Sequence, residues 1–105
     1  MKYTIEERAK RHQEIMNGLN ELYVSKNKEY GDSFHDLYKD LGIISAVTQI
    51  THKYNRLKTL AKDYAVLQDK ANVENESLTD TLLDLANYCV LTVMEIEREQ
   101  NESED

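Results

Sequence analysis

The sequence has 105 residues, of which 31% are charged, and it carries a net charge of −7 with a pI near 4.9. A chain of this length forms one domain by default, and we predict a single helical domain over residues 1–100 and a frayed acidic tail over 101–105. Since Lys and Arg must neutralise phosphates when a protein binds DNA or RNA, this acidic composition excludes polymeric nucleic acid as the expected partner. The N-terminus lacks a secretory signal, and no stretch reaches the roughly 18 apolar residues of a membrane span. We therefore expect a cytoplasmic protein with no membrane partner.

A first long helix is predicted over residues 4–28, where apolar side chains recur at helical spacing. These are Ile15, Met16, Leu19, Leu22 and Tyr23. Gly31 suits a left-handed cap at the end of this helix, because glycine adopts that conformation without steric cost. Asp32 or Ser33 can then cap a short helix that ends before Gly42.

Two further long helices follow, the first along a seam of seven apolar residues: Ile43, Val47, Ile50, Tyr54, Leu57, Ala61 and Tyr64. Residues 69–75 are polar and predict a loop. The last helix is predicted from near Ser77 to about Glu99, on the stripe formed by Leu78, Leu82, Leu85, Cys89, Val93 and Ile96. The absence of proline fits long helices. The predicted fold is an all-α bundle of three long helices and one short one.

The last helix is also apolar on its far side, at Leu83, Leu91 and Met94. Such a helix must be covered on two faces, and a chain this short buries only part of its apolar surface by itself. We therefore expect a homo-oligomer, a dimer or higher. Cys89, the single cysteine, has no disulfide partner and is expected to behave as a small buried hydrophobe.

Glu76, Asp80 and Asp84 recur every fourth residue, which stacks three carboxylates along one helix face. Their mutual repulsion is relieved if they bind a cation such as Mg²⁺, which prefers oxygen ligands. The alternative is helix capping, since Ser77 and Asp80 have the spacing of a capping box and Glu76 suits the helix dipole. Asp84 lies too far into the helix to be a cap.

Candidate phosphate ligands occur at Lys53 and Arg56, three residues apart on the flank of the third-helix seam. An Arg and a Lys at the edge of a bundle can hold a phosphate, although an ordinary salt bridge to a neighbouring acid is the more common role of such residues. Lys26 lies at the end of the first helix, beside a turn where the amides that begin the next helix could bind an anion, and Tyr30 of that turn could stack on a base.

Three motifs occur in a fixed order: Tyr30-Gly31, then Lys53-x-x-Arg56-Leu57, then Glu76-Ser77-x-x-Asp80-Thr81-x-x-Asp84-x-x-Asn87-Tyr88. In these motifs, residues 26–90 resemble the nucleotide-modification-associated family of phage and bacterial proteins. The resemblance implies a role in nucleotide metabolism, and in the host cytoplasm if the protein is phage-encoded. It also adds Asn87 and Tyr88 to the nucleotide-binding candidates.

A more distant resemblance is to the MazG-like all-α nucleotide pyrophosphohydrolases, which are Mg²⁺-dependent helical bundles. The sequence departs from their second acidic motif, because Glu76 and Asp80 are separated by one residue too many. The expected function is binding of a nucleotide through its phosphates. Mg²⁺-dependent hydrolysis of a nucleoside triphosphate, with release of pyrophosphate, would follow if a bound metal activates a water molecule. The alternatives are a non-catalytic protein that sequesters a nucleotide or nucleotide-derived signal, and a structural subunit without a ligand. No catalytic residue is assigned.

Overall fold

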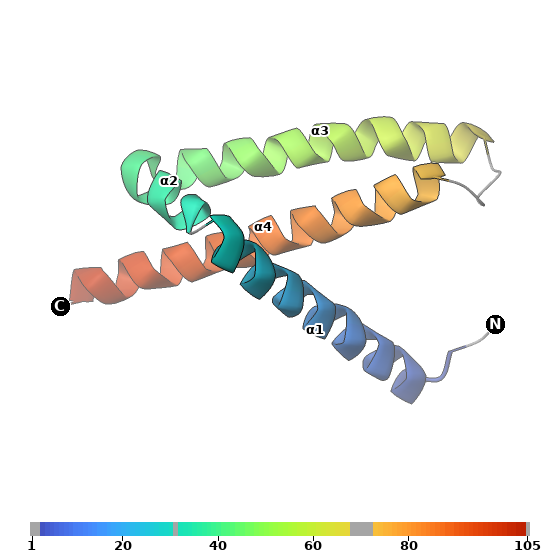
Figure 1. Ribbon diagram of the computed structural model, residues 1–105, viewed down its shortest axis with the longest axis horizontal. Coiled ribbons are helices and arrows are strands. Elements are labelled where there is room, and N and C mark those ends of the chain that lie inside the picture. Colours follow the sequence, from blue (N-terminus) through green and yellow to red (C-terminus); the bar gives the residue numbers. More distant parts are fainter. Residues whose placement is uncertain (1–2, 31, 68–72, 105) are drawn as a thin grey trace. The chain divides into compact units, whose positions relative to one another are not determined.

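The computed structural model describes residues 3–30, 32–67 and 73–104, with the backbone alone at 29–30, 66–67, 73–76 and 103–104. Within these ranges it contains no strand and four helices: α1 (Ile5–Tyr30), α2 (Ser33–Leu41), α3 (Ile43–Leu67) and α4 (Val73–Glu104) (Figure 1). The prediction of an all-α fold with three long helices and one short one is confirmed. None of the described helices is long and apolar enough to cross a membrane.

The chain divides into two compact units, Met1–Asp32 and Ser33–Asp105. The first unit is α1, which Thr4 caps: its hydroxyl accepts a hydrogen bond from the Glu7 amide at 3.1 Å. The predicted glycine cap after α1 lies outside the described residues. One domain over residues 1–100 stays a prediction.

In the second unit, Gly42 separates α2 from α3. Its φ of 72° is left-handed, and its amide donates to the carbonyl of Tyr38 at 2.7 Å, which closes α2. Its carbonyl in turn accepts from the amide and the hydroxyl of Ser45, at 3.0 and 2.8 Å, at the start of α3. The predicted end of the short helix before Gly42 is confirmed.

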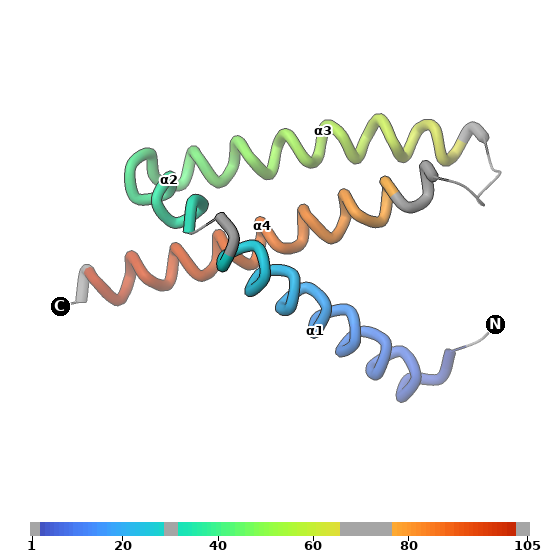
Figure 2. Tube along the Cα trace, viewed as in Figure 1, coloured from blue at the N-terminus to red at the C-terminus, as the bar shows by residue number. Residues whose placement is uncertain are grey.

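Helices α3 and α4 lie side by side and antiparallel, and α2 packs against both (Figure 2). Buried and half-buried side chains along α3 and α4 indicate which sides face each other. On α3 these include Ala46, Ile50, Lys53, Leu57 and Leu60; on α4 they include Thr81, Asp84, Leu85, Tyr88, Leu91, Thr92 and Glu95. The helices thus meet along lines that include charged and hydroxyl side chains.

The predicted apolar seams are therefore only partly correct. Ile50 and Leu57 do lie on the facing line of α3, but Val47 and Tyr54 are 48% and 51% exposed. Of the predicted α4 stripe, Leu78 and Leu85 are half-buried, whereas Leu82, Val93 and Ile96 are exposed. Cys89 is exposed too, so its predicted burial is wrong for the single chain. The apolar period of a helix places its apolar side chains on one side but does not say what covers that side.

Helix α4 begins at Val73, four residues before the predicted start at Ser77. Ser77 lies inside the helix, one turn after its first residue, and its carbonyl accepts a hydrogen bond from the Thr81 hydroxyl at 2.8 Å. The capping-box prediction is therefore wrong. At the other end, α4 continues to Glu104 through most of the predicted frayed tail. Of the predicted loop, residues 69–72 lie outside the described residues and 73–75 are helical.

Candidate functional site

An ion pair joins the middle of α3 to the middle of α4. The Nζ atom of Lys53 donates to Oδ2 of Asp84 at 3.2 Å, and the two side chains are 30% and 31% exposed. Of the two predicted roles for Lys53, the salt bridge is the one present in the structure. Both charges remain accessible enough to exchange partners.

Other predicted residues share the face on which this ion pair lies. Helical geometry, at about 100° per residue, places Arg56 about 60° from Lys53, on the side of α3 away from Val47. It likewise places Asp80 and Asn87 about 40–60° from Asp84 around α4. We call this surface, formed by Lys53, Arg56, Asp80, Asp84 and Asn87, the polar face.

Exposure varies across the polar face. Arg56 and Asp80 are exposed, whereas Asn87 is half-buried. Within the part of the chain that the structure describes, the Arg56 guanidinium makes no hydrogen bond or ion pair. Its planar fork of donors is therefore open to a ligand such as a phosphate.

Tyr88 lies on the line that faces the other helices. Its ring stacks on Phe34 of α2, with ring centroids 5.8 Å apart and ring planes at 24°. The predicted nucleotide-binding residue is thus half-buried and already has an aromatic neighbour. Its ring helps to position α2 on α4.

No described contact places the remaining predicted residues, Lys26, Tyr30 and Glu76, on the polar face. Lys26 is exposed on α1, in the other unit. The side chains of Tyr30 and Glu76 lie outside the described residues. Among described side chains, no group of three or more His, Cys, Asp or Glu is arranged to hold a metal ion. The predicted carboxylate row is represented by Asp80 and Asp84, one turn apart.

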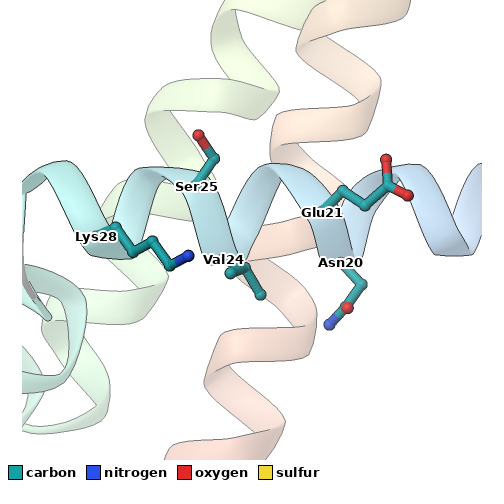
Figure 3. A pocket seen from close by; sticks show the side chains of 5 residues that line it. All are labelled: Asn20, Glu21, Val24, Ser25 and Lys28. Atoms are coloured by element: carbon teal, nitrogen blue, oxygen red, sulfur yellow. The ribbon is translucent and has the colours of Figure 1, made fainter.

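A hollow on α1 is an unrelated surface feature (Figure 3). Its described lining consists of Asn20, Glu21, Val24, Ser25 and Lys28, all from this one helix. Side chains of a single helix diverge from its axis and do not enclose a ligand. None of these residues is a predicted site residue.

A cluster that the sequence did not predict joins α2 to the C-terminal half of α4. It consists of His35, Tyr38, Glu95, Arg98 and Glu99. Glu95 is only 9% exposed; it contacts Nδ1 of His35 at 2.8 Å and accepts from Nε of Arg98 at 2.9 Å. The Tyr38 hydroxyl, in a side chain that is 1% exposed, donates to Glu99 at 3.2 Å. Burial, reinforced by the Glu99 carboxylate, raises the pKa of Tyr38.

Comparison with known proteins gives one result. Residues 26–96 match the family described as nucleotide modification associated domain 1, a range that includes the whole polar face. No curated protein and no solved structure gave a match, and no comparison supports the resemblance to the MazG-like enzymes. Because the match covers more than half of the chain, the protein belongs to the nucleotide modification associated domain 1 family.

Proposed function

We propose that the protein binds a nucleotide on the polar face, with Lys53 and Arg56 contacting its phosphates. The observation that supports this is the position of the Lys53–Asp84 ion pair on the facing lines of α3 and α4. Apolar side chains at such positions are often as stabilising as an ion pair or more so. A sequence that departs from this rule commonly does so at a functional site.

The chemistry of the two cations suits a phosphate group. Arg56 offers a planar fork that can bind two phosphate oxygens at once, and Lys53 acts as a point charge beside it. An incoming phosphate would replace Asp84 as the partner of Lys53. Asp84 would then be free to bind a Mg²⁺ ion together with Asp80, since Mg²⁺ is commonly held by one or two carboxylates and the substrate phosphates.

Mg²⁺-dependent hydrolysis is the second candidate, and a specific observation favours it. Because α4 begins at Val73, Asp80 is not a helix cap, and it lies one turn from Asp84 on the face that carries Lys53. A metal ion held there could lower the pKa of a bound water and stabilise charge that develops on the phosphate. A protein that only sequesters a nucleotide would need the two cations but not the two carboxylates.

The binding proposal is tested by calorimetric titration with nucleoside triphosphates. Lys53→Ala and Arg56→Ala should each weaken binding by about 10- to 150-fold, because a charge-assisted hydrogen bond contributes about 1.5–3 kcal/mol. Lys62→Ala is the matched control, since Lys62 is exposed on a different side of α3 and the substitution removes the same charge. If the first two variants bind as tightly as the parent, the phosphate assignment is wrong.

Hydrolysis is tested separately, by incubating the protein with nucleoside triphosphates and Mg²⁺. Pyrophosphate released in excess over the protein identifies an enzyme. Binding that saturates at a fixed stoichiometry, with no release, identifies a sequestering protein.

A further inference from the structure

On the side of the α3/α4 pair opposite the polar face, large apolar side chains are exposed. Six of them have exposed fractions between 36% and 53%, and Cys89 is exposed among them. They are Ile43, Val47 and Tyr54 of α3, and Leu82, Val93 and Ile96 of α4. We call these six residues and Cys89 the apolar face.

The two helices contribute to the same side of the pair. When each helix is viewed from its N-terminus, its residues of the apolar face lie clockwise of the side chains that face the other helix. The rotation between the two is roughly 80–110°. Because the helices are antiparallel, equal rotations turn both stripes toward one side. By the same construction Arg56 and Asp80, which lie anticlockwise, belong to the other side.

Charge distinguishes the apolar face from the rest of the molecule. The chain carries 20 acidic residues and a net charge of −7. On α4, however, Asp80 and Asp84 are on the polar face, Glu95 and Glu99 contact α2, and Glu102 pairs with Arg98. Of the acidic side chains of α4 that the structure describes, this leaves Glu97 at the edge of the apolar face. A second copy of an equally acidic chain can approach this surface without bringing carboxylates together, whereas it would meet like charges elsewhere.

The second unit also has only a small core of its own. Within its described residues, the hydrophobic side chains that are fully buried are those of Tyr38 and Ala46. A unit of this size needs more buried apolar surface to offset the entropy of folding. A second copy of the same chain is present whenever the protein is made, and it can cover the apolar surface that the second unit leaves exposed.

The apolar face supplies part of the area of a stable interface. From Leu82 to Ile96 it runs along α4 for about 21 Å, and across the two helices it is about 20 Å wide, which is about 400 Å² in projection. The accessible area of a side-chain surface exceeds its projection, and a standard interface buries about 800 Å² per partner.

We propose that a second copy of this chain covers the apolar face, so that two α3/α4 pairs form a four-helix core with two-fold symmetry. A two-fold axis pairs this patch with its own counterpart, as a self-complementary surface requires. The polar faces then lie on the outside of the dimer, one on each copy. This inference does not depend on nucleotide binding.

Cys89 reports on the proposal in the full-length protein, because it is the single cysteine and lies within the apolar face. Its rate of reaction with a thiol reagent should fall at least tenfold as protein concentration rises from about 1 µM to about 100 µM, in parallel with a doubling of mass in sedimentation. A monomer at all concentrations contradicts the proposal. If the protein is a monomer and Cys89 reacts rapidly, the apolar face is uncovered. If the protein is a monomer and Cys89 reacts slowly, another part of the same chain covers the face.

A pair of variants locates the interface. Leu82→Glu places a charge about 20° from Cys89 around α4 and should abolish the dimer. Met94→Glu is the control: Met94 is as exposed as Leu82, at 46%, but it lies about 140° from Cys89 around α4. If Leu82→Glu retains the dimer, the proposed face is wrong. If this variant does not fold, the concentration dependence of Cys89 reactivity in the parent protein decides.

Discussion

Glu95 of α4 and His35 of α2 form a two-pronged contact in which Nδ1 of the imidazole lies 2.8 Å from one carboxylate oxygen and 2.9 Å from the other. Arg98 holds the same carboxylate from within α4, at 2.9 Å. Burial acts to raise the pKa of Glu95, but the hydrogen bonds from Arg98 and His35 outweigh it and the pKa is lowered overall. The charged form of Glu95 therefore stabilises the packing of α2 on α4.

This contact predicts that the free energy of unfolding falls at acidic pH. Since the folded pKa of Glu95 lies below its unfolded value of about 4.3, its contribution is complete above that value and is lost as the pH falls through the folded pKa. Glu95→Gln should lower the free energy of unfolding by about 1–3 kcal/mol at pH 7, because His35 and Arg98 lose a charged partner. The difference from the parent should shrink at acidic pH.

Urea unfolding of the parent and the variant across a pH series measures this effect. Glu97→Gln, at an exposed position two residues further along α4, is the control and should change stability by less than about 0.5 kcal/mol. A Glu95→Gln variant as stable as the parent at pH 7 would show that the contact contributes nothing.

Asp84→Asn tests both roles of the polar face. Without nucleotide or Mg²⁺, the variant should lose about 0.5–1 kcal/mol of stability, because Lys53 keeps its charge and loses a partly exposed partner. With nucleotide and Mg²⁺ present, its melting temperature should rise less than that of the parent, since one proposed metal ligand is gone.

Melting curves with and without Mg²⁺ separate these effects. Asp40→Asn, at an exposed position on α2, removes the same charge away from the polar face and should leave the Mg²⁺ response unchanged. An undiminished Mg²⁺ response in Asp84→Asn would remove this residue from the proposed ligands.

Two glycines should respond to alanine with opposite signs. Gly42→Ala should destabilise by about 1–2 kcal/mol, because the φ of 72° is costly for any residue with a Cβ. Gly18→Ala should stabilise by about 0.5–1 kcal/mol, since Gly18 lies inside α1 and a Cβ there meets no atom within 4 Å. Thermal or urea unfolding of the two single variants measures both, and equal signs would contradict the assignment of Gly42 as the residue that separates α2 from α3.

The sequence alone predicted the helices and one of their boundaries, because these depend on local chemistry. The apolar period distinguishes a helix from a strand without reference to the rest of the chain. The end of α2 before Gly42 follows from the freedom of glycine to adopt a positive φ. The sequence also singled out Lys53 and Arg56 as cations on the flank of the third-helix seam, and their role as phosphate ligands stays a prediction.

The tertiary structure decided which helix faces meet, and which distant side chains pair. The period of α4 placed Leu82 and Cys89 on one stripe, but it could not say that these two side chains are exposed while Thr81 and Asp84 face α3. Covering an apolar stripe is equally favourable whether the cover comes from the same chain or from another, because the hydrophobic effect is not directional. His35 and Glu95 are 60 residues apart, and no local pattern links them. Their pairing arises because the turn at Gly42 and the antiparallel pairing of α3 and α4 bring α2 against the second half of α4.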